Sequence, residues 1–368
     1  MSDIISIEIK SSGTYKYDIE IGRDLFVRMS EELKNSNLAY RYSVVSDSNV
    51  SKIYYEKITS ALDIFNIDYK LITFPAGEIS KTRKTKEFIE NKMLESKMGR
   101  DTAIIALGGG VVGDIAGYVA ATYNRGIKYI QYPTSLVACV DSSIGGKTGV
   151  DTVHGKNLIG SFHQPYKVYI DINTLKTLGR DELKQGMAEV IKYGVIYDHE
   201  LFTFVENHLH KIYEYDFDAL KKIIKRSCEI KAYIVENDEK ESNLRKILNF
   251  GHTLGHAIEQ LSDYKITHGE AISAGMVLEA KIANKLNLIS SDDVRKIENI
   301  LKIASLPVTI DNTIDRTRLI EIMKLDKKAR SGIIEFALPL EIGTMHSSNG
   351  EYGIRVDENI INSIINAY

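Results

Sequence analysis

Polar side chains at helical spacing interrupt an apolar stretch of this chain, RKILNFGHTLGHAIEQLSDYKITHGE at residues 245–270. Steps of four, three, four and three residues separate Arg245, Asn249, His252, His256 and Glu259, so a helix through them would carry all five on one face. Most of the intervening residues are apolar, which predicts that this face is enclosed rather than solvated. Enclosed polar groups need partners, so we expect a ligand site here.

Two histidines of this segment, His252 and His268, are candidate metal ligands, and His256 is a further ligand or a proton shuttle. His252 and His256 lie four residues apart, and an isolated pair of histidines at that spacing more often consists of hydrogen-bonded core residues. Here the neighbouring arginine and asparagine, and a third histidine followed by Gly-Glu, favour a metal site. Gly251 and Gly255 each cost about 1 kcal/mol relative to alanine within a helix, which indicates a close approach by another helix or a ligand.

A second helical pattern, GMAEVIKYGVI, places Glu189 and Lys192 three residues apart on one face. An exposed ion pair is the ordinary explanation of that spacing. As a third ligand, however, Glu189 would complete a site of two histidines and one carboxylate, which leaves a position open for substrate on zinc. Lys192 would then be a cation for the substrate.

The length of 368 residues indicates about two domains. A hydrophobic content of 43% and a charged content of 26% are ordinary for a globular protein. The formal net charge of −3 gives no support to a nucleic-acid or membrane-surface partner, so local positive charge must meet any anionic substrate.

Two cysteines and the N-terminal residues indicate the compartment. Cys139 and Cys228 lie in apolar segments and are expected to be buried free thiols, which fits a cytoplasmic location. The N-terminal MSDIISIEIK has neither a basic flank nor a long apolar run, so no signal peptide or membrane span is expected.

The first half of the chain alternates short apolar runs with helical stretches, as an open α/β domain does. Paired strands are expected at residues 4–9 and 17–21, and further strands at 41–46, 69–74, 102–107, 127–132 and 168–172. From Asp181 onward the pattern is nearly all helical. We therefore predict a Rossmann-like α/β domain over residues 1–175 and an all-α domain over residues 176–368.

A glycine-rich turn follows the apolar run TAIIAL and precedes a helical stretch. Its sequence GGGVVGD contains Gly108, Gly110 and Gly113 in the pattern G-x-G-x-x-G, which lets a pyrophosphate approach the backbone at a helix N-terminus. The acidic residue expected about 20 positions later is missing. Asp47 and Glu78, which follow earlier strands, could replace it in a variant NAD site, although a turn or helix cap explains Asp47 equally well and could explain Glu78.

The segment DSSIGGKTGVDTVHGKNLIG follows the strand expected at 127–132. Its GGKT resembles a P-loop, but the preceding glycine spacing fails the pattern G-x-x-x-x-G-K-[ST], so a nucleoside triphosphatase is rejected. Asp141, Lys147, Lys156 and Asn157 remain in a flexible segment suited to holding a phosphate or polyol, although single loop lysines are more often merely solvated. Lys231, within CEIKAYIV, either reaches solvent or meets an anion.

Taken together, GGGVVGD, DSSIGGKTGVD with HGKNLIG, EVIKYG, LNFGHTLGHAIE, HGEAISAGM and LDKK resemble the motifs of the 3-dehydroquinate synthases, in the same order and over nearly the whole chain. The resemblance implies an NAD-binding α/β domain followed by a helical metal-binding domain, with the active site in the cleft between them. It also implies a homodimer, because Arg125 reaches the phosphate site of a neighbouring subunit in this family.

The resemblance assigns roles residue by residue. Zinc or cobalt would be held by Glu189, His252 and His268. NAD would contact Asp47, Asn49, Glu78, Lys81, Gly108, Gly109, Gly110, Gly113, Asp114, Thr134 and Ser135. The sugar phosphate 3-deoxy-D-arabino-heptulosonate 7-phosphate would meet Arg125, Asp141, Lys156, Asn157, Lys231, Arg245, Lys327 and Lys328. Catalytic roles would fall to Lys147, Lys192, Asn249 and His256, with His256 as the proton shuttle.

The family reaction oxidises a substrate alcohol with NAD, eliminates phosphate, returns the hydride, opens the ring and closes a carbocycle by aldol addition. Three alternatives are another sugar phosphate cyclase, a metal-dependent polyol dehydrogenase and an inactive NAD-binding protein. Asn249 and His256 favour dehydroquinate synthesis, because the valiolone-forming relatives differ at both positions. A polyol dehydrogenase would not need so many phosphate-binding cations together, and an inactive protein has no chemical reason to keep all three metal ligands.

Overall fold

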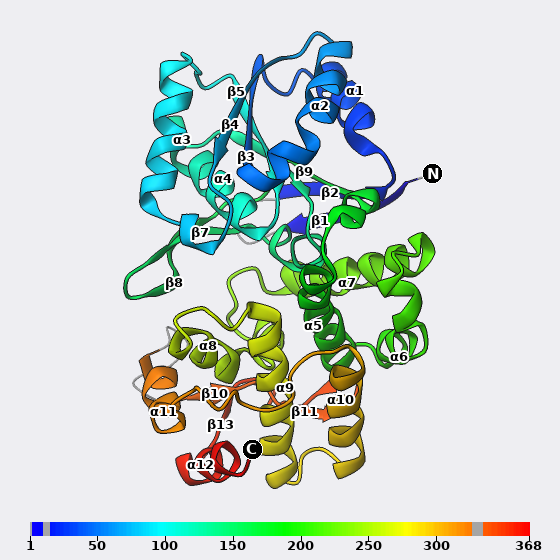
Figure 1. The fold of residues 1–368 in the computed structure, drawn as a ribbon, viewed down its shortest axis with the longest axis vertical. Helices are drawn as coiled ribbons and strands as arrows, with labels where there is room; N and C mark the ends of the chain where they lie inside the picture. Colours follow the sequence, from blue (N-terminus) through cyan, green and yellow to red (C-terminus); the bar gives the residue numbers. More distant parts are fainter. Residues whose placement is uncertain (1, 10–14, 326–333) are drawn as a thin grey trace. The chain divides into compact units, whose positions relative to one another are not determined.

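The computed structural model describes residues 2–9, 15–325 and 334–368 (Figure 1). The chain divides into two compact units: unit 1 comprises Met1–Leu178 with Leu220–Ala232, and unit 2 comprises Gly179–Ala219 with Tyr233–Tyr368. The sequence places a single boundary after residue 175. In the structure, the middle of helix α7 (Phe217–Asn237) belongs to unit 1, so the chain passes from one unit to the other more than once.

Unit 1 is built on a seven-stranded sheet with the strand order β1-β2-β9-β6-β5-β3-β4. Its strands are β1 (Asp3–Ile9), β2 (Tyr15–Gly22), β3 (Arg41–Asp47), β4 (Asp68–Phe74), β5 (Thr102–Gly108), β6 (Lys128–Pro133) and β9 (Lys167–Asp171). Strands β1 and β2 pair antiparallel, and the other neighbours pair parallel. The strands expected from the sequence are thereby confirmed, each within two residues at either end.

Helices cover both faces of this sheet, because successive side chains of a strand point to opposite faces. On β5, Ala103, Ile105 and Leu107 pack with helices α1 (Leu25–Ser36) and α2 (Ser48–Ile64). The alternate residues Ile104 and Ala106 pack with helices α3 (Arg83–Glu95) and α4 (Gly110–Thr122). Every residue of β5 is buried, which explains why TAIIAL is a continuous apolar run. The α/β fold predicted for this part of the chain is confirmed.

The carboxyl ends of four parallel strands, β4, β3, β5 and β6, share one edge of the sheet. The register pairs Asp47 with Phe74 and Gly108 with Pro133, so these strand ends are level. Ligands of open α/β sheets bind at such an edge. The loops that carry the predicted NAD residues all begin there.

Besides the middle of α7, the described part of unit 1 contains four short helices and a hairpin. The short helices are η1 (Glu78–Ser80), η2 (Tyr123–Arg125), η3 (Ala138–Ser142) and η4 (Ile172–Thr177). Strands β7 (Lys147–Thr152) and β8 (Gly155–Phe162) form an antiparallel hairpin that packs on α4. The segment that the sequence indicates as flexible and glycine-rich therefore has regular structure, and its hairpin carries Lys147, Lys156 and Asn157.

Unit 2 is helical, as predicted. It contains parts of α7 and the helices α5 (Arg180–Ile196), α6 (His199–Tyr213), α8 (His252–Leu261), α9 (His268–Lys285), α10 (Ser291–Ile303), α11 (Arg316–Leu325) and α12 (Glu358–Ala367). Two small sheets add β10 (Glu335–Phe336) with β13 (Ile354–Arg355), and β11 (Pro339–Glu341) with β12 (Thr344–Met345). Helix α9 packs against α5, α8 and α10. Among the described residues, no helix is long and apolar enough to cross a membrane.

The prediction of one helix from Arg245 to Glu259 is wrong. A short 3-10 helix, η5 (Leu244–Asn249), comes first, and α8 begins at His252 after Gly251, whose φ of 79° lies in the left-handed region that favours glycine. A Cβ on Gly251 would lie 2.8 Å from the carbonyl oxygen of Ile272, and a Cβ on Gly255 would lie 3.0 Å from the Ile272 Cα. The close approach expected at these two glycines is therefore made by a helix, α9.

Gly275 on α9 lies close to the backbone of the same turn. A Cβ there would overlap the carbonyl oxygen of Gly251 and lie 2.9 Å from the Gly255 nitrogen. Because backbone atoms cannot rotate away, we expect Gly275→Ala to lower the free energy of unfolding by about 3 kcal/mol. Urea unfolding measures this, with Gly99→Ala as the control because its nearest neighbour is the side-chain carboxylate of Asp101. Equal losses in the two variants would contradict the packing argument.

Candidate active site

Three side chains converge in unit 2. Nε2 of His268 lies 3.0 Å, and Nε2 of His252 lies 3.4 Å, from the same oxygen, Oε1 of Glu189. Glu189 lies on α5, while His252 and His268 are the first residues of α8 and α9. The ligating atoms all lie within 4.8 Å of one another, and two imidazoles with one carboxylate suit zinc or cobalt. The structure thus brings together the three metal ligands predicted from the sequence.

Burial and mutual contacts set the charges of this group. Burial raises the pKa of Glu189, but Lys192 and the two histidines outweigh burial and hold that pKa well below its ordinary value. Burial and the nearby Lys192 lower the pKa of His252 to about 3. Burial also opposes the charged form of His268, yet hydrogen bonds with Glu189 and Glu259 raise its pKa to about 10. A divalent ion at this group therefore competes with a proton on His268.

Lys192 lies one helical turn from Glu189 on α5. Its Nζ is 2.5 Å from Oε2 of Glu189, and only 1–2% of the lysine is exposed. The explanation of this pair as an exposed surface ion pair is therefore wrong. Both charges are enclosed beside the histidines, where a cation can hold the carboxylate or meet an anionic ligand.

Of the remaining polar residues of the 245–259 stripe, His256 lies beside the metal group, whereas Asn249 and Arg245 bond to another segment. The rings of His256 and His252 meet edge to face, with centroids 5.3 Å apart. Nδ2 of Asn249 donates a hydrogen bond of 2.6 Å to Oε1 of Glu241. Arg245 is buried, and its Nη1 donates to the carbonyl oxygen of Glu239. A predicted catalytic residue, Asn249, and a predicted substrate contact, Arg245, are thus held by the loop that follows α7.

Asp238 organises that loop, and the sequence reasoning missed it. Its carboxylate accepts hydrogen bonds from the backbone N–H groups of Ser242, Asn243 and Arg245, at 2.8, 2.7 and 3.0 Å. Burial raises the pKa of Asp238, but these hydrogen bonds outweigh burial and hold the pKa below its ordinary 3.8. An acidic residue just after a helix, ahead of a polar loop, was the signal in the sequence.

We expect Asp238→Asn to lower the free energy of unfolding by about 1–3 kcal/mol at neutral pH, because backbone donors would lose a charged acceptor. The folded pKa is depressed, so this stabilisation is complete above the unfolded value of 3.8 and is lost as the pH falls through the folded pKa. The difference between parent and variant should therefore shrink in acid. Urea unfolding at neutral and successively lower pH measures it, and a difference that grows in acid would contradict the assignment.

In unit 1, the glycine turn between β5 and α4 forms a cradle. A Cβ on Gly109 would lie 3.3 Å from Oγ of Ser135, and a Cβ on Gly110 would lie 3.1 Å from Oγ of Ser142. Gly109 is the N-cap of α4, and no side chain in the described structure caps it, so the first N–H groups of the helix suit a phosphate. The cradle therefore fits a pyrophosphate, and it adds Ser142, which lies in the motif DSSIGGKTGVD but had no predicted role.

Predicted NAD and substrate residues also meet beside this edge. Nζ of Lys81 lies 2.6 Å from Oδ2 of Asp114, and both side chains are largely buried. Nζ of Lys156 lies 3.3 Å from Oε1 of Glu78. Lys156 on the hairpin therefore contacts the loop after β4. The family resemblance assigns Lys156 to the substrate and Glu78 to NAD.

Asp151 ties the same two segments together. Its N–H donates to the carbonyl oxygen of Lys81 at 2.7 Å, and its Oδ1 accepts from the N–H of Asn157 at 2.9 Å. Separately, Nζ of Lys231 on α7 donates to Oδ1 and to the backbone oxygen of Asp141, both at 2.6 Å. Lys231 therefore meets an anion within unit 1 rather than reaching solvent.

Two predicted NAD residues, Asp47 and Thr134, make hydrogen bonds within the fold, and a predicted substrate contact, Arg125, is exposed. Asp47 caps α2, because its Oδ1 accepts from the N–H groups of Asn49 and Val50 at 2.8 and 3.0 Å. Thr134 follows β6, and its N–H donates to the carbonyl oxygen of Gly108. Arg125 is exposed and has a φ of 69°. Two more predicted substrate contacts lie outside the described residues, Lys327 and Lys328.

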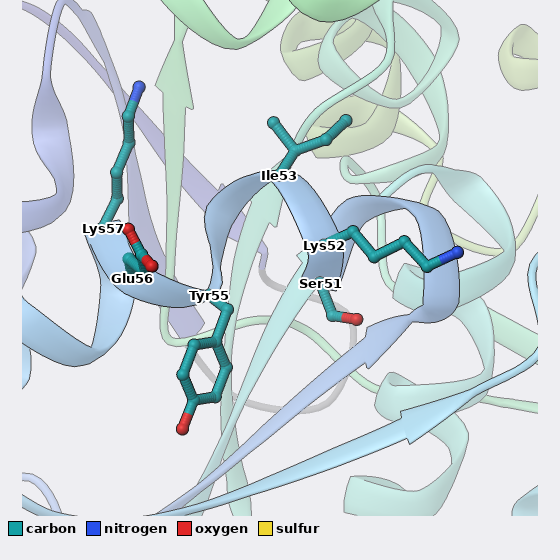
Figure 2. A pocket seen from close by; sticks show the side chains of 6 residues that line it. All are labelled: Ser51, Lys52, Ile53, Tyr55, Glu56 and Lys57. Carbon is teal, nitrogen blue, oxygen red and sulfur yellow. The ribbon is translucent and has the colours of Figure 1, made fainter.

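A surface pocket runs along helix α2 (Figure 2). It is lined by Ser51, Lys52, Ile53, Tyr55, Glu56 and Lys57. These side chains include two lysines and a glutamate that are exposed, and the set contains none of the predicted site residues. This pocket is therefore not the candidate active site.

Two protein-family models match adjoining parts of the chain. Residues 71–185 match the family model described as 3-dehydroquinate synthase N-terminal, and residues 186–329 match 3-dehydroquinate synthase C-terminal. The chain belongs to the 3-dehydroquinate synthase family. A curated family member from Thermoanaerobacter sp. is 45% identical over 342 residues, which cover 93% of this chain and 95% of that protein.

Solved structures of two other enzymes share the fold of this chain. A 2-deoxy-scyllo-inosose synthase complexed with carbaglucose-6-phosphate, NAD+ and Co2+ is 27% identical, with a TM-score of 0.89 over 99% of both chains. A 2-epi-5-epi-valiolone synthase from Streptomyces hygroscopicus with NAD+ and Zn2+ bound is 24% identical, with a TM-score of 0.87 over 98% of both chains, and shares the fold.

Proposed function

We propose that this chain is a 3-dehydroquinate synthase, which converts 3-deoxy-D-arabino-heptulosonate 7-phosphate to 3-dehydroquinate and phosphate. The observation that carries the proposal is the convergence of His252 and His268 on Glu189 in a chain of this family. NAD and a divalent ion, zinc or cobalt, are its cofactors. When bound, NAD accepts and returns a hydride, and the ion acidifies the substrate hydroxyl.

The residues of the chain supply binding, orientation and proton transfer. We assign the metal to Glu189, His252 and His268, and proton transfer at the substrate hydroxyl to Nε2 or Nδ1 of His256, whose ring lies against that of His252. Cations and amides hold the anionic ends of the substrate and so fix its reacting conformation. We assign this to Lys147, Lys156, Asn157, Lys192, Lys231, Arg245 and Asn249. Asp141, whose carboxylate accepts a hydrogen bond from Lys231, is assigned to the same substrate site.

We also propose a homodimer in which Arg125 of one subunit serves the phosphate site of the other. The exposed side chain of Arg125 and its left-handed backbone, next to Asn124 with a φ of 50°, support a dedicated role for this turn. Light scattering of the purified protein tests the dimer, and a monomer at assay concentration would contradict it.

A cytoplasmic location is supported by Cys139 and Cys228, which are buried and not disulfide-bonded.

The test of function is phosphate release from 3-deoxy-D-arabino-heptulosonate 7-phosphate with catalytic NAD and added zinc. We expect metal-dependent phosphate release, dehydroquinate as the product, no accumulation of NADH, and loss of turnover with EDTA. Accumulation of NADH without phosphate release would point instead to a polyol dehydrogenase. Turnover only with other sugar phosphates would assign the chain to a different cyclase, such as one that forms an inosose.

A further inference from the structure

A buried carboxylate stands beside the metal group without a role in the assignments above. Glu259 lies on α8 and is 2% exposed. Its Oε2 lies 3.2 Å from Nδ1 of His268, whose other nitrogen, Nε2, lies 3.0 Å from Oε1 of Glu189. The imidazole of His268 therefore lies between two carboxylates, one at each ring nitrogen.

This arrangement separates the tasks of the two nitrogens. An acceptor at Nδ1 keeps a proton on that nitrogen, and the lone pair of a neutral imidazole is then on Nε2, available to an ion. His252 has the same arrangement with a backbone acceptor, because its Nδ1 lies 3.1 Å from the carbonyl oxygen of Phe250. Both histidines thus present Nε2 to the same oxygen of Glu189.

The backbones on both sides of the Glu259–His268 contact are held in place. The carbonyl oxygen of Glu259 accepts hydrogen bonds from Oγ of Ser262 and from the N–H of Tyr264, at 2.8 and 2.9 Å. Thr267, just before His268, forms a capping box with Glu270 at the start of α9. The contact therefore joins two fixed points, the end of α8 and the beginning of α9.

We propose that Glu259 is a positioning residue that orients His268 for metal binding, by accepting a hydrogen bond from its Nδ1–H and so directing Nε2 to the ion. This inference rests on the metal site of the proposed function. Its competitor is direct ligation, since ligating atoms of His256, Glu259 and His268 also lie within 4.8 Å of one another. Nε2 atoms of two histidines converge on Glu189 and not on Glu259, which favours positioning over ligation.

The experiment measures metal binding without substrate. The parent, Glu259→Ala and Glu259→Gln are stripped with a chelator and titrated with Zn2+ and Co2+ in competition with a chromophoric chelator. We expect Glu259→Ala to weaken binding about 10–100-fold. Glu259→Gln retains an acceptor for Nδ1, so it should weaken binding less and leave the visible Co2+ bands where the parent has them. Gln260→Ala, the exposed next residue of α8, is the matched control and should bind like the parent.

Three results would overturn the proposal. The first is a metal affinity of Glu259→Ala within twofold of the parent, since a merely structural role would change only the unfolding midpoint of the metal-free protein. The second is a second bound ion per chain. The third is a change of Co2+ bands in Glu259→Gln that indicates a lost ligand. If Glu259→Ala does not fold, the Glu259→Gln titration decides. A parent that binds one ion yet releases no phosphate would refute the proposed function alone.

Discussion

Replacement of His268 by alanine is expected to lower kcat/KM for phosphate release at least about a thousandfold and to weaken zinc binding in parallel. His268 contributes one of three ligating atoms that lie within 4.8 Å of one another, and its loss leaves Glu189 with a single imidazole partner. A divalent ion supplies several kcal/mol of charge stabilisation, and about 4 kcal/mol corresponds to a thousandfold change in rate. Phosphate release and chelator competition measure the two effects.

His210→Ala is the control for that variant. His210 is exposed in the last turn of α6 and has no predicted role, so its replacement should leave both metal binding and turnover unchanged. Zinc affinity of His268→Ala equal to that of the parent would remove His268 from the ligand set. A loss of metal with full activity would instead show that turnover does not need the ion.

Replacement of Lys81 by methionine is expected to destabilise unit 1 by about 3 kcal/mol, because it leaves the carboxylate of Asp114 buried without its partner. Side chains of Lys81 and Asp114 are only 6% and 15% exposed, and their charged atoms lie 2.6 Å apart. Burial already raises the pKa of Asp114 despite this lysine. NAD binding should weaken as well, since Lys81 lies in the loop that carries Glu78. Urea unfolding and NAD titration measure the two losses.

Lys92→Met is the matched control for Lys81→Met. Lys92 pairs with Glu95 at 2.7 Å, but the two side chains are 44% and 63% exposed, so the pair contributes about 0–0.5 kcal/mol. The double variant Lys81→Met with Asp114→Asn should recover part of the lost stability, because the unpaired charge is gone. If Lys81→Met and Lys92→Met lose equal stability, burial of the Lys81–Asp114 pair does not contribute as argued.

Local patterns in the sequence predicted the strands of the main sheet and the three residues of the candidate metal site. Continuous apolar runs identify the strands of unit 1, because a strand buried on both faces has no polar alternation. The glycine spacing after β5 predicts a turn that a pyrophosphate can approach. In the structure, a Cβ added to Gly109 or Gly110 would lie 3.3 or 3.1 Å from a serine hydroxyl. Two histidines and a glutamate were chosen for their donor chemistry and their apolar surroundings, and these three side chains meet.

The tertiary structure alone decided how the buried polar groups are partnered. Helical periodicity runs through Gly251, yet the chain turns there because α9 crosses too closely for a continuous helix. Asp238, Asp151 and Glu259 each bond to another part of the chain. Glu259 belongs to the spaced stripe at residues 245–259, but that spacing does not identify its partner, and no pattern in the sequence identifies a partner for the other two. The physical reason is that periodicity reports which face of an element is apolar, whereas a buried hydrogen bond needs a partner delivered by another element. That delivery depends on packing, which only the folded chain specifies.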